Sequence, residues 1–235
     1  MTEGRDHMKT IQEIYNDFDA IGCLTFATVS ADGYPETRIA HLFAWDEEGL
    51  YFLTMNHKPF ARQLRESGKL SICGMSSRTQ AEIDDRMLPS FEAGYTLKAT
   101  GDVREVPLEE IREKAGNNPL FLTGVNDWDR YQDEIFFCLY RFWGEKYDFD
   151  YELEYRSHKL IREFFTFGGF EKHFTGMKID QEKCIHCGAC FDRCAEYHFH
   201  AVQKTEDGYN IDTGKCDVCG NCTLVCPVNA IISVC

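Results

Sequence analysis

The C-terminal part of the chain contains the same cysteine run twice, and this repeat constrains the fold more than any other feature. The first run is Cys184, Cys187, Cys190 and Cys194, and the second is Cys216, Cys219, Cys222 and Cys226. Both runs have the spacing C-x2-C-x2-C-x3-C. Gly188 and Gly220 follow the second cysteine of each run and give the loop the backbone freedom to wrap around a bound group. Two copies of one spacing indicate a metal centre built from thiolates.

This is the spacing by which bacterial ferredoxins hold [4Fe–4S] clusters. Three thiolates on a tight loop ligate three iron corners of one cubane, and the fourth cysteine of each run caps the cluster of the other run. The expected ligands of cluster I are Cys184, Cys187, Cys190 and Cys226, and those of cluster II are Cys216, Cys219, Cys222 and Cys194. The sequence therefore predicts electron transfer through two [4Fe–4S] clusters.

A zinc site or a disulfide framework accounts for the cysteines less well. A zinc ribbon uses two C-x2-C pairs for one ion, which leaves four of the eight thiols without a role. A disulfide framework belongs to an oxidising compartment, and the N-terminal sequence lacks the apolar segment of a signal peptide. One departure from the usual pattern is Ala195, which stands where the second run carries Pro227, but it removes no ligand.

Length and charge narrow the class of protein further. The chain has 235 residues, more than a two-cluster ferredoxin domain requires, so a second domain is expected. The formal net charge of −14 argues against nucleic acid as a partner, because binding to phosphates needs a basic surface. The acidity is explained either by solubility or by docking to a basic redox partner protein or carrier. No apolar run is long enough to span a membrane. We expect a cytoplasmic protein of an anaerobic or oxygen-poor organism, where low-potential clusters are best preserved.

The N-terminal part has a mainly β pattern. Apolar periodicity predicts a helix over residues 9–20. Strands are predicted at 23–30, 36–45, 50–55, 70–76, 95–106, 134–143 and 159–167, with helices at 59–67 and 107–115. The short turns between the first three strands require an antiparallel meander. We predict a closed β-barrel with inserted helices rather than a doubly wound sheet, followed by a small α+β two-cluster ferredoxin domain.

Three segments in this region carry a family resemblance. They are Gly33-x-Pro35-x-x-Arg38, then Leu50–Thr54, and then the run from Lys58 to Leu64. In this order they resemble the pyridoxamine 5'-phosphate oxidase-like flavoproteins over roughly residues 8–150. The resemblance implies a split barrel that binds FMN, and a homodimer with the FMN near the interface.

The resemblance also implies the residues that contact FMN. The implied phosphate contacts are Arg38, Thr54, Asn56, His57 and Lys58, and the strand Arg38, Ile39, Ala40 and His41, together with Leu53, would lie along the flavin. Trp143 and Lys146 would contact the ring from the partner subunit; a core aromatic and a solvated lysine are the alternatives. Elementary chemistry agrees, because a phosphate dianion is stabilised by Arg, Lys and the free amides of a helix N-terminus, here near Pro59. The alternative for Arg38 and Lys58 is that they are ordinary surface cations.

The sequence departs from true pyridoxamine phosphate oxidases at the substrate site. Those enzymes carry a C-terminal Arg-rich segment, whereas Arg156 and Arg162 lie at that place in a different context. The helix start also reads Lys58-Pro59-Phe60 in place of a more basic run. We therefore do not predict vitamin B6 oxidation, since the fold does not fix the substrate.

The two parts together predict a redox protein with domains 1–170 and 179–235. The main hypothesis is an FMN- and iron–sulfur-dependent oxidoreductase that passes electrons between an external carrier, the clusters, the flavin and a small substrate. The rival hypothesis is a non-catalytic electron carrier or redox sensor, and a third is a barrel that has lost FMN and serves as a scaffold. The sequence identifies neither a catalytic residue nor the substrate.

Overall fold

The computed structural model describes residues 9–76, 82–83, 85, 87, 89–90, 94–148, 161–171 and 176–234. The chain forms two compact units. The first comprises Met1–Gly74, Leu97–Glu145 and Phe164–Lys172, and the second comprises Met75–Thr96, Lys146–Glu163 and His173–Cys235. The domain limits 1–170 and 179–235 stay a prediction.

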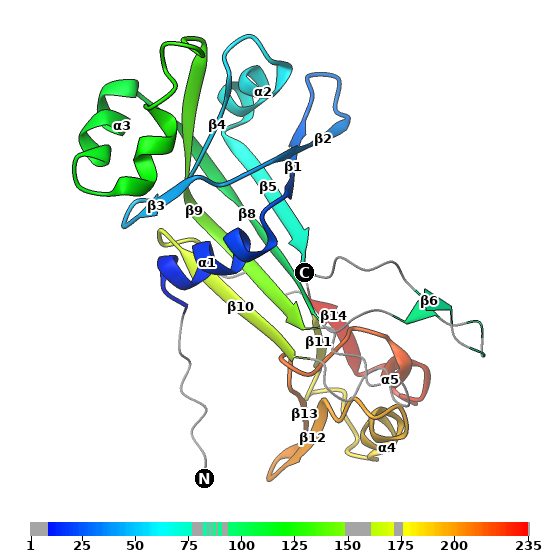
Figure 1. The fold of residues 1–235 in the computed structure, drawn as a ribbon. Helices are drawn as coiled ribbons and strands as arrows, with labels where there is room; N and C mark the ends of the chain where they lie inside the picture. Colours follow the sequence, from blue (N-terminus) through cyan, green and yellow to red (C-terminus); the bar gives the residue numbers. More distant parts are fainter. Residues whose placement is uncertain are drawn as a thin grey trace. The chain divides into compact units, whose positions relative to one another are not determined.

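The main sheet has eight strands in the order β2-β1-β5-β8-β9-β4-β3, with β10 paired to β9 (Figure 1). The strands are β1 Leu24–Val29, β2 Pro35–Ala40, β3 Ala44–Asp46, β4 Gly49–Met55, β5 Lys69–Met75, β8 Tyr95–Val106, β9 Glu134–Asp148 and β10 Ile161–Phe167. The pairs β1–β2, β1–β5, β3–β4 and β4–β9 are antiparallel. This antiparallel sheet is of the split-barrel type, which confirms the predicted fold class.

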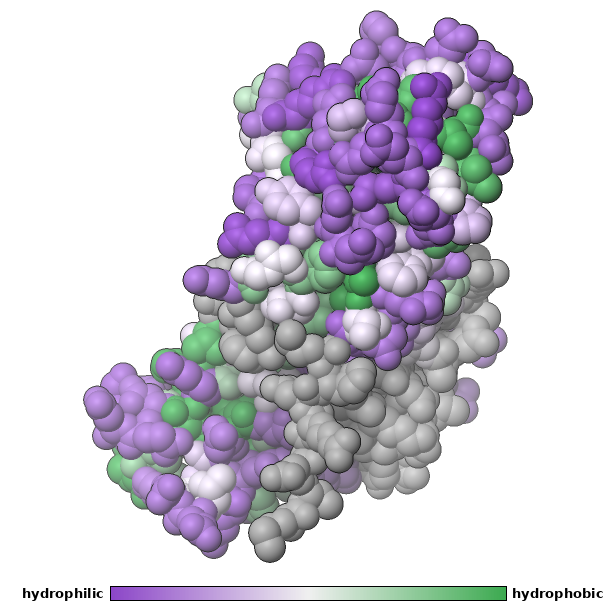
Figure 2. All heavy atoms as spheres, turned by 90° about the vertical axis from the view of Figure 1, so that its left-hand side faces the viewer, coloured by the Kyte–Doolittle hydropathy of each residue, from purple (hydrophilic) through white to green (hydrophobic). Residues whose placement is uncertain are grey.

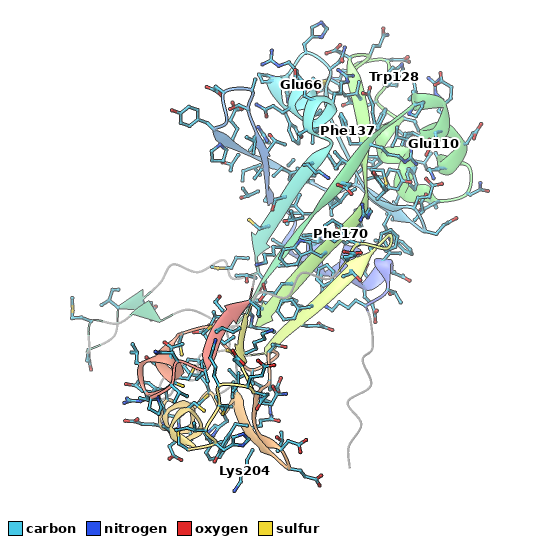
Figure 3. The ribbon with its side chains drawn as sticks, turned by 180° about the vertical axis from the view of Figure 1, so that it is seen from behind. Glu66, Glu110, Trp128, Phe137, Phe170 and Lys204 are labelled. Carbon is cyan, nitrogen blue, oxygen red and sulfur yellow. The ribbon has the colours of Figure 1, made fainter. Side chains whose placement is uncertain are left out.

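Alternating burial explains why β1 is a strand with one face toward the core. In β1, Leu24, Phe26 and Thr28 are buried and the residues between them are more exposed. The ring of Phe26 meets that of Phe52 edge-on at 5.1 Å, and Phe52 stacks on Phe137 at 5.6 Å. Phe137 lies among the strands, whereas Glu66 and Glu110 lie on helices at the outside (Figure 3). Each such buried ring contributes about 1.5–3 kcal/mol of transfer free energy.

The helices of the first unit begin and end at residues suited to those positions. They are α1 Ile11–Ile21, α2 Pro59–Ser67, α3 Leu108–Ala115 and the 3-10 helix η1 Pro119–Gly124. Thr10 and Glu13 form a reciprocal capping box at the start of α1. Pro59 opens α2, and Gly68, with φ of 63°, ends it in the left-handed conformation. The predictions for α2 and for β8 are confirmed to the residue.

One predicted strand is wrong, and so is the three-strand meander predicted around it. Residues 36–45 do not form a single strand, because the chain changes its pairing partner within them. Ala40 pairs with Leu24 of β1, whereas Ala44 pairs with Tyr51 of β4. The amide of Phe43 already donates to the carbonyl of Tyr51 at 2.9 Å. The segment therefore divides into β2 and β3, which lie at opposite ends of the strand order.

The second unit contains the cysteine runs. Its elements are the hairpins β6 Glu82–Ile83 with β7 Pro89–Ser90 and β12 Val202–Thr205 with β13 Gly208–Ile211, the pair β11 Gly176–Ile179 with β14 Ile231–Val234, and the helices α4 Ala189–Glu196 and α5 Asn221–Leu224. Ile179, Val202, Ile211 and Ile231 form one small core with six of the eight cysteines, whereas Cys187 and Cys219 are exposed. This arrangement confirms the predicted small ferredoxin-like region.

The surface is consistent with the acidic composition. Figure 2 shows a face on which hydrophilic residues predominate and hydrophobic ones occur in small groups. In the described part of the chain, no helix combines the length and the apolar character needed to cross a membrane.

Candidate functional site

Two cavities in the second unit gather the eight cysteines of the runs. The cavity of cluster I is lined by Cys184, Cys187, Cys190 and Cys226. The cavity of cluster II is lined by Cys216, Cys219, Cys222 and Cys194. Each cavity thus combines three thiols of one run with the last thiol of the other run. This is the grouping that the expected ligand exchange requires.

The backbone of each run bends around its cavity through two residues with positive φ. His186 and Val218 occupy equivalent places between the first two cysteines and have φ of 56° and 58°. Gly188 and Gly220 follow the second cysteines with φ of 81° and 76°. A β-branched residue such as Val218 rarely adopts this conformation, so the run holds it at a cost of about 1–3 kcal/mol. Strain of this kind is typical of loops that bind a ligand.

Main-chain amides donate to the sulfur atoms. The amides of Ala201 and Val202 lie 3.2 and 3.5 Å from Sγ of Cys194, and that of Ala230 lies 3.2 Å from Sγ of Cys226. The amide of Val218 donates to Sγ of Cys216 at 3.4 Å. Hydrogen bonds to sulfur are one of the means by which proteins set the potential of an iron–sulfur cluster.

The donor set fits a multi-iron cluster. Burial raises the pKa of the thiols of Cys190 and Cys216, and that of Cys222 to about 11, so these thiols stay protonated until a metal displaces the proton. Among the described residues, no group of three or more His, Cys, Asp or Glu side chains has the arrangement of a metal-ion site. Four thiols around one cavity suit a cubane, whose iron corners lie apart from one another.

A third cavity, of about 600 Å³, lies in the first unit. It is bounded by β2, by the end of β4 and by the start of α2. Its lining includes Arg38, Ile39, Ala40, His41, Leu53, Thr54 and Lys58 from the predicted set, together with Glu36, Thr37, Phe43, Met55, Pro59, Phe60 and Thr123. The volume lies within the range of small-molecule and cofactor sites.

The guanidinium of Arg38 is fixed from several sides. It donates to Oγ1 of Thr28 at 2.7 Å and to Oε1 of Gln63 at 3.0 Å, and it lies 4.2 Å from the centre of the Phe60 ring. Thr28 in turn donates to the same oxygen of Gln63 at 2.5 Å. Burial lowers the pKa of Arg38, and the carboxylate of Glu36 opposes that shift. These contacts fix the position of the Arg38 cation, which lines the cavity.

The start of α2 adds further groups that attract an anion. Lys58 is the N-cap residue, and no side chain in the described part of the chain caps the helix there. Pro59 has no N–H, and the first-turn amide of Phe60 receives no side-chain cap. Arg38, Lys58 and a helix N-terminus on one cavity together form an arrangement that suits a phosphate.

Four residues of the predicted set are not among those that line this cavity. Asn56 accepts from Arg65 at 2.7 Å, and His57 pairs with Asp133 at 2.8 Å. Trp143 lies under the ammonium of Lys98 at 5.4 Å, and the ammonium of Lys146 lies 4.1 Å from the ring of Tyr95. Contacts from Trp143 and Lys146 to the FMN of a partner subunit stay a prediction, as do all the ligand and cofactor contacts.

The residues that support Arg38 were not predicted from the sequence. Gln63 is 2% exposed and Thr28 is 5% exposed, so both are buried polar groups. A signal for Gln63 was present, because it lies in the buried stripe of α2 with Phe60, Ala61 and Leu64. A polar residue in an apolar stripe must find a buried partner. Arg162 lies in the second unit, where it donates to Cys216, and Arg156 lies outside the described residues.

Two family models match separate parts of the chain. Residues 9–121 match the family model described as "Pyridoxamine 5'-phosphate oxidase". Residues 177–234 match the family model described as "4Fe-4S dicluster domain". No curated protein matches the chain.

Several solved structures resemble the chain. A NimC/NimA family protein from Clostridium acetobutylicum is 18% identical, with 71% of this chain and 99% of that chain covered and a TM-score of 0.48. A pyridoxamine 5'-phosphate oxidase-related, FMN-binding protein from Nostoc punctiforme PCC 73102 is 13% identical, with 69% and 89% covered and a TM-score of 0.44. HutZ, the heme storage protein from Vibrio cholerae, is 21% identical, with 55% and 87% covered and a TM-score of 0.38. Similarity at this level says nothing about the substrate. By the two family matches, the chain is similar to a pyridoxamine 5'-phosphate oxidase-like split-barrel protein fused to a C-terminal 4Fe–4S dicluster domain.

Proposed function

We propose that this protein is an oxidoreductase that uses one FMN and two [4Fe–4S] clusters to exchange electrons between a carrier and a small substrate. The proposal is based on the presence of three cavities in one chain. Two of them are each lined by four cysteines, and the third is lined by the cations Arg38 and Lys58, which suit a phosphate. FMN exchanges electrons singly or in pairs, whereas each cluster exchanges one at a time. A protein with both kinds of group can couple one-electron and two-electron partners.

The residues of the first unit would bind and orient the flavin. Arg38 and Lys58 neutralise the phosphate, and the uncapped start of α2 offers it an amide. Gln63 and Thr28 hold Arg38 in place, so little side-chain freedom is lost when the anion binds. The main chain of β2 at Ile39 and Ala40 would face the ring system.

The setting of the protein is part of the same proposal. A homodimer would let Trp143 and Lys146 reach the flavin of the partner subunit, and sedimentation equilibrium of the holoprotein tests this with the mass of a dimer as the expected result. The acidic surface suits a basic electron carrier. A reducing cytoplasm would preserve the clusters.

The first experiment is quantification of cofactors in protein purified anaerobically. We expect about eight irons, about eight sulfides and about one FMN per chain, from two cubanes and one flavin. Four irons or fewer in fully reconstituted protein would contradict the two-cluster proposal. Protein with full iron but no flavin, even after incubation with FMN, would contradict the flavin site.

A screen of candidate acceptors then separates an enzyme from a carrier. The reduced holoprotein is mixed anaerobically with small molecules, and the flavin absorbance is followed. Rapid reoxidation by a small acceptor at saturable concentration supports an enzyme. Reoxidation by redox proteins alone would support the carrier hypothesis instead.

A further inference from the structure

The two cysteine runs belong to a longer repeat whose copies make the same contacts. Ile179-Asp180-x-x-Lys183-Cys184 is repeated as Ile211-Asp212-x-x-Lys215-Cys216. The amide of Asp180 donates to the carbonyl of Ala230 at 2.7 Å, and the amide of Asp212 donates to that of Ala201 at 2.8 Å. The amide of Ala230 in turn donates to Sγ of Cys226, and the amide of Ala201 donates to Sγ of Cys194, both at 3.2 Å. Because the two copies make equivalent contacts, the surroundings of the two clusters can be compared position by position.

Arg162 breaks this symmetry. Its guanidinium donates to the carbonyl of Cys216 at 2.9 Å, and its main-chain amide donates to the carbonyl of Gly214 at 2.8 Å. These two bonds hold the loop that carries the first cysteine of the second run. Arg162 comes from β10, which lies outside the repeat, so the first run has no equivalent of it in the repeated sequence.

The linings of the two cavities also differ in their charged residues. Of the described residues, those around cluster I other than the cysteines are Gly188, Tyr209 and apolar residues. The cavity of cluster II also contains Arg193, Asp217 and Asn221. Arg193 pairs with Glu196 at 3.4 Å, and Asp217 accepts from the hydroxyl of Tyr147 at 2.8 Å. Arg162 adds a further cation on the side of cluster II, and its guanidinium contacts the main chain of a ligand residue directly.

Reduction of a cluster adds one negative charge to a group that already carries anionic thiolates. A cation nearby stabilises the reduced form more than the oxidised form, and the effect is strong where water is excluded. Cys216 is 8% exposed, so its surroundings are poorly screened. The carboxylate of Asp217 acts in the opposite direction, and its hydrogen bond from Tyr147 weakens that effect.

We propose that the positive charge of Arg162 selectively raises the reduction potential of cluster II, so that cluster II is reduced before cluster I. This inference rests on the proposed pair of clusters. It gives the two clusters different roles, with cluster II as the site where a single electron resides.

The test is an anaerobic redox titration of the holoprotein followed by electron paramagnetic resonance. The wild type should show two one-electron steps. In Arg162→Gln, the step at higher potential should fall by about 59 mV, which is a tenfold change in the ratio of reduced to oxidised cluster for a one-electron couple. Arg162→Lys keeps the charge and should stay near the wild type. Asp217→Asn should raise the same step.

Arg112→Gln is the matched control, because it removes one exposed positive charge on α3 in the first unit. It should move neither step. An Arg162→Gln protein that holds full iron and shows no shift, or an equal shift of both steps, would overturn the role of Arg162. An equal fall in Arg162→Lys would show that charge is not the cause and would also overturn it.

Iron content separates this inference from the proposed function. If Arg162→Gln loses about half its iron, Arg162 is needed to hold cluster II in place, and the proposed effect of its charge on the potential is overturned. If it loses all its iron, the selective link to cluster II is overturned. A wild type with one cluster would overturn both proposals, whereas a wild type with two clusters and an unshifted variant would overturn this one alone.

Discussion

Arg38 shows how single residues prepare the cavity of the first unit for an anion. Its guanidinium contacts Thr28, Gln63 and the face of Phe60, and all three neighbours are buried. Arg38 also forms an ion pair with the partly exposed carboxylate of Glu36 at 3.4 Å, and an ion pair exposed to water is weak. The side chain can therefore keep one geometry and still bind a phosphate.

This arrangement gives a prediction for Gln63. Gln63→Leu removes the acceptor that orients Arg38, so the affinity for FMN should fall about tenfold, which is the effect of losing one hydrogen bond to a charged group. Quenching of FMN fluorescence on titration into protein freed of flavin measures this. Arg62→Gln, an exposed residue on the same helix, is the control and should bind FMN as the wild type does. Equal affinity of Gln63→Leu and the wild type would show that Arg38 needs no support.

The sequence predicted the identity of the cysteine ligands better than it predicted the directions and burial of other side chains. The repeated cysteine spacing located all eight thiols that line the two cavities, because the spacing is local and chemically specific. The directions of Asn56 and His57 were not accessible, since they depend on Arg65 and Asp133. Gln63 was missed because glutamine is usually exposed, and its burial depends on Thr28 and Arg38 from two strands.

Elements were predicted well where their ends carry strong signals. Pro59 and Gly68 mark the two ends of α2, and both act through local backbone geometry. The break between β2 and β3 has no such signal. It arises because Ala40 pairs with β1 and Ala44 with β4, and pairing partners are a property of the whole sheet.

Close contact between strands gives a prediction at this scale. A Cβ atom on Gly144 of β9 would lie 2.3 Å from the ring of Phe165 and 2.4 Å from the carbonyl of Lys98. Gly144→Ala should therefore lower the free energy of unfolding by about 2 kcal/mol through overpacking. Chemical denaturation followed by circular dichroism measures the change.

A second glycine serves as the control for Gly144. Gly116 ends α3 with φ of −65°, a conformation that alanine adopts readily. Gly116→Ala should leave stability within about 0.5 kcal/mol of the wild type. If Gly144→Ala were as stable as Gly116→Ala, the close packing of β8, β9 and β10 at this point would be contradicted.

At the scale of the whole molecule, the two family matches and the three cavities describe a chain that combines flavin-type and iron–sulfur-type sites. The class of chemistry was accessible from sequence because it depends on short motifs. The substrate was not, because it depends on the shape and polarity of the space left above a bound cofactor.

The combination of one FMN with two clusters fixes the number of electrons that one chain accepts. Anaerobic reductive titration of fully loaded protein, followed by absorbance of flavin and clusters, should consume about four electron equivalents per chain, two for FMN and one for each cluster. Addition of less than a full complement should leave electrons distributed between flavin and clusters at equilibrium. Uptake of about two equivalents with no change in flavin absorbance would contradict the proposed combination of one FMN with two clusters.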